Sequence, residues 1–314
     1  MSVLLLLSAC GAPGAAQAVI QQHTRCNPTG YHAPRWSPDG KRIAFLMEDY
    51  TSSSIYLDMI DVDSRNYARL GVFTGGLSAP SWSPDGSRLV VAAGVETRID
   101  VIDIATLKVT RILSPSRHDY YAPDWSPDGQ SLALTWFRNE YPTIAIASLT
   151  GALVNDGIEG GNPPPVIKSL FNELGPIEGW TPRWSPDGSR LAYTGPWGSG
   201  DRSIIVLNAD GSGQSVLVSH SQMLDGLSWS PDGMKIAYAI GSNAGLAIYV
   251  IDVASGSKTL VFNGGASPDL APDGKRFAFV ANDPNGYQEV YIMNLDGSGL
   301  TQLTHNRANG ICLH

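Results

Sequence analysis

One pentapeptide, Trp-Ser-Pro-Asp-Gly, constrains this chain more than any other feature because it recurs at similar spacing. Five intact copies begin at Trp36, Trp82, Trp125, Trp184 and Trp229, and an altered sixth copy, Leu-Ala-Pro-Asp-Gly, begins at Leu270. Successive copies are 41 to 59 residues apart, a period typical of a propeller blade or a solenoid turn. The sequence therefore predicts an array of similar units.

The pentapeptide has the chemistry of a hairpin turn. Ser suits the first position of a type I turn, Pro presets φ at the second, and Gly accepts a left-handed φ at the last. Such a turn commonly joins two antiparallel strands. A short run with strand composition follows each copy, at residues 42–46, 88–92, 131–135, 190–194, 235–239 and 276–280. Each copy is thus predicted to end one strand and begin the next.

Two further runs in each unit complete a set of four strands. Four strands in six units predict an all-β fold, a six-bladed β-propeller of four-stranded antiparallel blades, because radial closure leaves only short sheet edges. The predicted blades are residues 31–73, 74–114, 115–171, 172–219, 220–263 and 264–304, with a closing tail at 305–314. The extra length of the third unit, residues 150–165, has no strand or helix periodicity and is predicted to be a loop.

With these Trp-Ser-Pro-Asp-Gly copies, residues 31–314 resemble the TolB propeller family. The resemblance implies a ring that binds protein segments in the bacterial cell envelope, without a cofactor. TolB also carries an N-terminal α/β domain, for which the residues before 31 leave no room. The resemblance therefore implies the propeller and its habit of binding protein or peptide partners, and it names no particular partner.

The first residues are typical of an export signal. Residues 1–9 form an apolar run that ends in small residues, which is a signal-peptide pattern. Leu7 to Cys10 resembles the bacterial lipobox, which implies that Cys10 is lipidated and anchors the chain to a membrane. Residues 10–30 would then be a flexible linker, and the true translation start would lie upstream. The alternative is an ordinary signal peptide or a fortuitous apolar start; either export signal would place the propeller on the periplasmic or extracellular side.

Two cysteines remain, Cys26 and Cys312, at opposite ends of the predicted ring. A ring brings its ends together, and exported proteins form disulfides. We therefore expect a disulfide between them; the alternative is two free thiols in the chain termini.

Composition limits the partners. The chain has 29 acidic and 21 basic residues, a net charge of −8, and no basic stripe, which argues against a nucleic-acid partner. Only 16% of the residues are charged, so recognition by hydrogen bonding and aromatic contact is favoured. We expect a monomer.

Aromatic residues concentrate on one predicted face. The Trp residues of the motif are expected to pack between blades, whereas the other three fall on the face opposite the Trp-Ser-Pro-Asp-Gly turns. Aromatic and Arg side chains favour recognition because they give large contact areas at small entropic cost. The predicted binding face comprises Trp136, Trp180, Trp197, Tyr120, Tyr121, Arg138, Tyr141, His32 and His118. The alternative is that these side chains pack the loops against the sheet ends.

No catalytic motif stands out. The chain has no Gly-x-Ser-x-Gly elbow followed by an acid and a His, and no His pair with metal-ligand spacing. We therefore predict no catalytic residue and no metal site, and a non-enzymatic, envelope-anchored scaffold that captures a protein or peptide. The alternative is a glycan-binding propeller, or one similar to the oligogalacturonate lyases, with His32, His118 and His220 gathered around a divalent metal at the axis.

Overall fold

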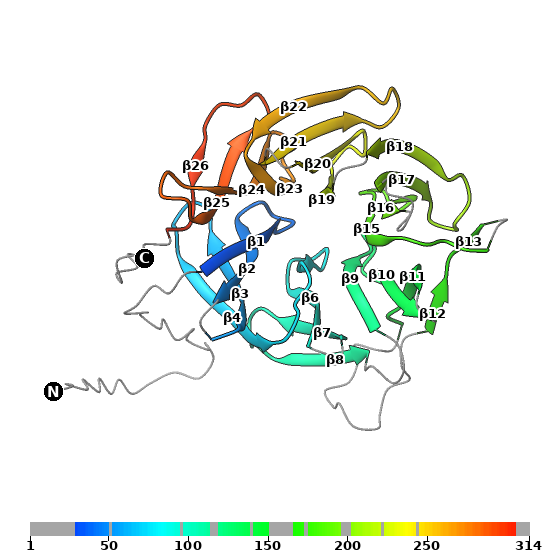
Figure 1. The fold of residues 1–314 in the computed structure, drawn as a ribbon. Helices are drawn as coiled ribbons and strands as arrows, with labels where there is room; N and C mark the ends of the chain where they lie inside the picture. The colour runs from blue at the N-terminus through cyan, green and yellow to red at the C-terminus, as the bar shows by residue number, and fades with distance from the viewer. Residues whose placement is uncertain are drawn as a thin grey trace.

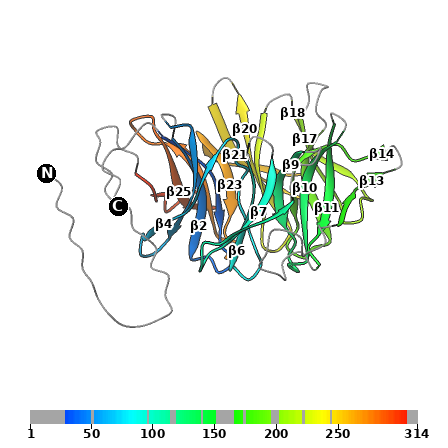
Figure 2. The same ribbon diagram turned by 90° about the horizontal axis from the view of Figure 1, so that it is seen from below.

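The computed structural model describes residues 29–49, 52–94, 97–113, 119–138, 141–150, 166–172, 175–195, 202–220, 223–242 and 245–305. These residues form six four-stranded antiparallel sheets arranged as a ring (Figure 1). Seen from the side, the sheets stand next to one another around a common axis (Figure 2). No helix occurs in this described part of the chain. The predicted fold class, a six-bladed propeller of four-stranded blades, is confirmed.

The first three blades each use four consecutive strands, and a short hairpin follows the third. Their strands are β1 (Thr29–Trp36), β2 (Arg42–Asp49), β3 (Ser54–Asp61), β4 (Tyr67–Thr74), β5 (Ser81–Trp82), β6 (Arg88–Ala93), β7 (Arg98–Asp103), β8 (Val109–Leu113), β9 (Asp119–Trp125), β10 (Ser131–Arg138), β11 (Tyr141–Ser148) and β12 (Val166–Ser169). The hairpin consists of β13 (Phe171–Asn172) and β14 (Gly175–Pro176). The predicted loop at 150–165 lies, apart from Thr150, outside the described residues.

The last three blades repeat the same order. Their strands are β15 (Trp180–Trp184), β16 (Arg190–Gly195), β17 (Arg202–Asn208), β18 (Ser215–His220), β19 (Met223–Trp229), β20 (Lys235–Ser242), β21 (Gly245–Asp252), β22 (Lys258–Asn263), β23 (Gly265–Leu270), β24 (Arg276–Asn282), β25 (Gln288–Asn294) and β26 (Thr301–Gln302). The first strand of each blade lies nearest the axis and the fourth lies outermost (Figure 1).

The repeated turns all lie on one face of the ring, which we call the turn face. In each copy the Gly N–H donates to the carbonyl of the first turn residue, as Gly40 does to Ser37 at 2.9 Å. The Gly residues have a left-handed φ of 67° to 72°, which costs Gly nothing. The Ser hydroxyl donates to the Asp side chain two residues on, as Ser37 does to Asp39 at 2.6 Å. The predicted type I turn chemistry is therefore present.

The turns also contact one another. A Cβ placed on the turn Gly of each blade would lie 3.7 to 4.0 Å from the turn Pro of the preceding blade, as for Gly86 and Pro38 or Gly274 and Pro231. Pro and Gly therefore serve the packing between blades as well as the local turn. The opposite face, formed by the connections between second and third strands and between blades, is called the loop face.

The hydrophobic core consists of six clusters, each between two adjacent blades. One cluster, for example, joins Val90 and Ile99 of the second blade to Trp125 and Leu132 of the third, and another joins the first and last blades. Middle strands such as β6 are buried on both faces, because each blade is covered by a neighbour on either side. The Trp residues of the motif contribute to these clusters, as predicted.

Candidate functional site in the central channel

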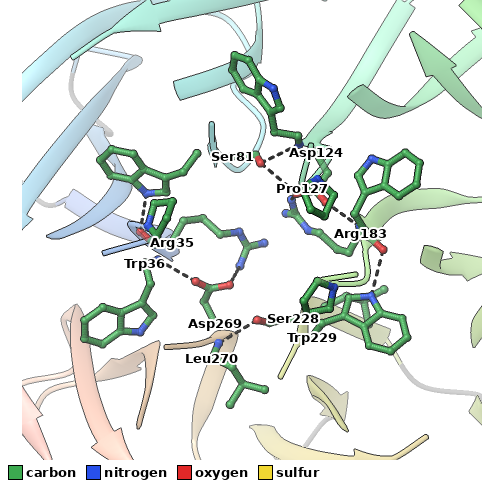
Figure 3. Close-up of a pocket in the computed structure, with 16 residues that line it drawn as sticks. Arg35, Trp36, Ser81, Asp124, Pro127, Arg183, Ser228, Trp229, Asp269 and Leu270 are labelled. Carbon is green, nitrogen blue, oxygen red and sulfur yellow. Dashed lines mark hydrogen bonds and ion pairs between the residues drawn. The ribbon is translucent and has the colours of Figure 1, made fainter. Parts of the chain in front are cut away.

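The residue before the motif Trp or Leu is the one that each blade directs at the axis. In chain order these residues are Arg35, Ser81, Asp124, Arg183, Ser228 and Asp269. Together with the motif Trp residues and the turn prolines Pro38, Pro127 and Pro186, they line a cavity of about 290 Å³ (Figure 3). We call these six residues the channel ring. Because turn prolines line the cavity, it lies at the turn-face end of the channel.

Where the side chain of the channel-ring residue can accept a hydrogen bond, it accepts one from a backbone N–H of the next blade. Trp125 N donates to Ser81 Oγ at 3.0 Å, and Trp184 N donates to Asp124 Oδ2 at 2.8 Å. Leu270 N bonds in the same way to Ser228 Oγ at 2.9 Å. These bonds satisfy buried backbone N–H groups of blades three, four and six, and buried N–H groups need such partners. The ring thus fixes each blade to its neighbour.

Where the channel-ring residue is Arg, a different bond replaces this one, because a guanidinium has no acceptor. The indole Nε1 of Trp82 donates to the carbonyl of Arg35 at 3.0 Å, and that of Trp229 donates to the carbonyl of Arg183 at 3.1 Å (Figure 3). At these two positions the backbone carbonyl of the channel-ring residue, and not its side chain, forms the link to the next blade.

The order Arg, Ser, Asp occurs twice around the ring, so blades one to three correspond to blades four to six. Outside the ring the correspondence holds only in part: Arg42 lies 5.1 Å from the Trp82 ring and Arg190 lies 5.0 Å from the Trp229 ring, but Arg276 of blade six also lies 4.9 Å from the Trp36 ring, where blade three has Ser131. The chain therefore has an approximate two-fold symmetry in its channel. Our sequence analysis missed the channel ring, although the position before each motif Trp carries this repeated pattern.

Two buried ion pairs cross between blades in the ring. Arg183 Nη1 lies 2.9 Å from Asp124 Oδ1, and Arg35 Nη1 lies 3.3 Å from Asp269 Oδ1. Burial, and then the facing charge of Arg183, lower the pKa of Arg35 to about 10, against the raising effect of the aspartates. Arg35 therefore stays charged at neutral pH, in a cavity that holds a second guanidinium.

A second level of side chains lies three residues before the channel ring on the inner strands of five blades, toward the loop face. It includes His32, Tyr121, Trp180 and Asp225. A β-bulge separates the two levels in five blades, and its central residue has a left-handed φ, at Ala33, Ala122, Thr181, Gly226 and Ser267. Bulges change the direction of nearby side chains, and here one bulge in each strand orients the side chains of both levels.

The aromatic members of this level meet between blades three and four. The rings of Tyr121 and Trp180 lie 5.7 Å apart, and Phe137 from β10 lies 6.0 Å from Trp180. All three side chains are half-buried. We call these three residues the aromatic cluster. Tilted aromatic pairs stabilise the packing, and because the three side chains are half-buried, part of their surface is accessible.

Polar members occupy the other side of the same level. His32 Nε2 lies 3.6 Å from Glu48 Oε2, and Asp225 Oδ2 accepts the backbone N–H of Ser267 at 2.9 Å. Burial lowers the pKa of His32, and the charges of Glu48 and Asp225 oppose that effect. The inner edge of the loop face thus has an aromatic side and a polar, acidic side.

The remaining residues of the predicted binding face differ in exposure. Tyr141, at the start of β11, is 61% exposed, whereas Tyr120 is 6% exposed and packs in the core between blades two and three. Trp136 is half-buried against the same core. Tyr120 thus contributes packing, and Tyr121, Trp180 and Tyr141 offer contact area. Arg138 ends β10, with its side chain outside the described residues, where Trp197 and His118 also lie.

Metal-binding groups are not assembled within the described residues, where no cluster of three His, Cys, Asp or Glu side chains suits a metal ion. Of the three His residues named for the lyase-like alternative, only His32 has a described side chain. Cys10, Cys26 and Cys312 lie outside the described residues, so lipidation and the disulfide stay predictions. No helix in the described part of the chain is long and apolar enough to cross a membrane.

The fold and the site define a class: a six-bladed propeller of self-contained blades with a charged ring in its channel. A family model described as the TolB beta propeller domain matches residues 7–160 and 199–311. The chain therefore belongs to the TolB β-propeller domain family, as the motif resemblance predicted. A comparison with curated proteins gives no match.

Solved structures support the same fold. TolB from Acinetobacter baumannii has a TM-score of 0.68 at 21% identity over 82% of this chain, which spans 62% of that TolB chain. A putative TolB from Agrobacterium tumefaciens has a TM-score of 0.63 at 20% identity, covering 80% of this chain and 88% of its own. An oligogalacturonate lyase from Vibrio parahaemolyticus has a TM-score of 0.54 at 16% identity, covering 88% and 78%. At these identities the likeness establishes the fold alone.

Proposed function

We propose that this chain is a non-enzymatic binding propeller of the bacterial cell envelope, which captures a polypeptide segment on its loop face. The observation that carries the proposal is the aromatic cluster, Tyr121, Phe137 and Trp180, at the inner edge of that face. Half-buried aromatic rings are pre-positioned contacts, since little side-chain entropy is lost when a partner binds.

The surroundings of the cluster favour a peptide ligand. Tyr141 adds an exposed ring on the neighbouring strand β11. His32 and Glu48 of the first blade offer polar groups across the ring from Trp180, and Asp225 offers a carboxylate on the fifth blade, where backbone amides of an extended segment could bond. A ligand that spans the mouth would thus meet apolar contacts at one end and polar contacts at the other.

The envelope location belongs to the same proposal. It rests on membership of the TolB propeller family and on the export pattern of residues 1–10, with Cys10 as the lipid attachment site. Lipid at Cys10 would hold the propeller at a membrane through the linker at 10–30. Mass spectrometry of the chain purified from its native membrane tests this part directly: a diacylated N-terminal Cys10 is expected, and an unmodified Cys10 would contradict it.

The binding part is tested by affinity capture from native envelope extracts. The full chain is compared with the double variant Tyr121→Ala/Trp180→Ala and with the single variant Tyr141→Ala. The matched control is Leu107→Ala/Met234→Ala, which removes exposed apolar side chains from the turn face. A protein retained by the wild type and control but lost with the loop-face variants is expected. Equal retention by all four proteins would overturn the proposal.

The glycan alternative is an outcome of the same experiment. Trp180 could stack on a sugar ring as well as on a peptide, and the lyase from Vibrio parahaemolyticus has a similar fold. Retention of an oligosaccharide that a chelator releases, without any protein, would favour a lyase-like propeller and make His32, His118 and His220 the next residues to change.

A further inference from the structure

Two arginines from opposite blades share the channel cavity. Arg35 belongs to the first blade and Arg183 to the fourth, and they are 7% and 6% exposed. Both guanidinium groups point into the pocket (Figure 3). Like charges are costly to hold together in a buried place unless they are compensated. Negative groups that balance the two arginines must therefore lie in or next to the cavity.

The two aspartates of the ring balance the charges of the two arginines, but they accept only some of the guanidinium N–H groups. Each aspartate bonds to one Arg Nη1, at 3.3 Å for Asp269 and 2.9 Å for Asp124. The same carboxylates also accept backbone N–H groups of Trp36 and Trp184, and Asp124 accepts the hydroxyl of Ser81. Much of their accepting capacity is thus committed to holding the blades together.

Donors remain in excess on the arginines. Nε of Arg35 and Nε of Arg183 are both buried, and neither has a hydrogen-bond partner among the described residues. A buried donor without an acceptor is a costly arrangement that native structures avoid or use. Guanidinium groups bind planar oxyanions through two parallel N–H bonds. The unmet donors of the two guanidinium groups point to an added oxyanion.

From this geometry we propose that the channel cavity binds a carboxylate between Arg35 and Arg183. A single negative charge suits the site because Asp124 and Asp269 flank it and would repel a dianion. The volume of about 290 Å³ admits a small free carboxylate or the terminal carboxylate of a peptide entering from the turn face. The site lies at the turn-face end of the channel, so it is independent of the proposed loop-face function.

Calorimetric titration of the full chain at constant ionic strength tests the proposal. The probes are acetate, sulfate, and an N-acetylated tetrapeptide with uncharged side chains and either a free or an amidated C-terminus. Acetate should bind more tightly than sulfate. A free peptide that binds more tightly than acetate, while its amide does not bind, identifies a chain terminus as the source of the carboxylate. A peptide that fails where acetate binds identifies a small free acid.

Two variants test whether acetate binds at the channel ring. The double variant Arg35→Met/Asp269→Asn removes one positive and one negative charge together and keeps an acceptor for Trp36 N. It should weaken acetate binding at least tenfold. The matched control is Arg190→Met, whose guanidinium stacks on Trp229 outside the cavity, and it should bind acetate as the wild type does. Equal affinity in the ring variant, or binding of sulfate alone, would overturn the proposal.

A measurement on the unaltered chain protects the test against a variant that fails to fold. The side-chain Nε–H resonances of Arg35 and Arg183 can be followed by ¹H–¹⁵N NMR during titration with acetate. Both resonances should shift together with one dissociation constant, because the two donors face one ligand. If neither resonance shifts before acetate reaches concentrations that also shift other arginines, the site is contradicted.

Discussion

Asp269 of the last blade accepts the backbone N–H of Trp36 of the first blade at 2.8 Å and also contacts Arg35 at 3.3 Å. Within the described residues every blade is built from consecutive strands, so no strand exchange closes the ring there. Closure rests on this pair, on the core cluster shared by the first and last blades, and on Arg276, whose guanidinium lies 4.9 Å from the Trp36 ring.

Asp269→Ala should therefore weaken the closure of the ring. The change leaves the buried guanidinium of Arg35 and the N–H of Trp36 without their acceptor, which should lower the free energy of unfolding by about 3–5 kcal/mol. Urea denaturation followed by Trp fluorescence measures the loss. Asp63→Ala, at an exposed turn residue, is the control and should stay within about 0.5 kcal/mol. A loss at Asp269 no larger than the control's would show that the pair does not close the ring.

Gly226 should tolerate no side chain. Its φ is +60°, and a Cβ there would lie 2.7 Å from the Cα of Ser267 and 2.8 Å from Cδ of Pro268 in the next blade. Gly256 also has a left-handed φ, +69°, but a Cβ there would meet nothing within 4 Å. Gly256→Ala should cost about 1–2 kcal/mol from backbone strain alone.

Gly226→Ala should then destabilise the protein by about 1–3 kcal/mol more than Gly256→Ala, because overpacking adds to the strain. The comparison is made on the free energies of unfolding of the two variants. Equal losses would mean that blades five and six are not in close contact at this bulge.

Acid should weaken the turn at Asp187. The hydroxyl of Ser185, at 2.6 Å, and then that of Ser189 lower the pKa of Asp187 to about 2, below the usual value of about 3.9 in an unfolded chain. The stabilising effect of the carboxylate is thus present above about pH 4 and is lost as the pH falls toward 2.

Removing the strongest donor should reverse this shift. In Ser185→Ala the titration midpoint of the Asp187 carboxyl, followed by ¹³C NMR, should rise toward the ordinary value, because the first hydrogen bond is gone. Ser212→Ala, which removes a donor to Asp210 in another turn of the same blade, should leave the Asp187 midpoint in place. An unchanged midpoint in Ser185→Ala would contradict the assignment of the shift to Ser185.

The sequence predicts what depends on local chemistry. Ser, Pro, Asp and Gly specify the turn by their own backbone preferences and short-range hydrogen bonds, and the β-rich runs beside them specify strands. These signals repeat six times, so the fold follows from them. The short hairpin of β13 and β14 was not predicted, because two-residue strands carry no periodic pattern.

The aromatic cluster and the channel ring depend on contacts between blades. The sequence predicts such contacts less well than it predicts the local structure. Successive residues of a strand point to opposite sides, so Tyr120 enters the core while Tyr121 approaches Trp180 of the next blade. Composition alone does not separate these neighbours. The channel ring depends in the same way on which position faces the axis. When the six motif copies are aligned, the residue before each copy follows the order Arg, Ser, Asp twice, and this pattern is the signal for the channel ring.

Site-specific photo-crosslinking in the native envelope tests most directly whether the loop face captures the partner. The photoreactive residue p-benzoylphenylalanine replaces Tyr141 on the loop face or Met234 on the turn face, side chains that are 61% and 62% exposed. Because exposure is matched, any difference reflects the face. We predict a discrete protein adduct at position 141 that is lost in Tyr121→Ala/Trp180→Ala, and none at 234. An adduct at position 234 alone, or one at 141 that survives the double variant, would contradict loop-face capture.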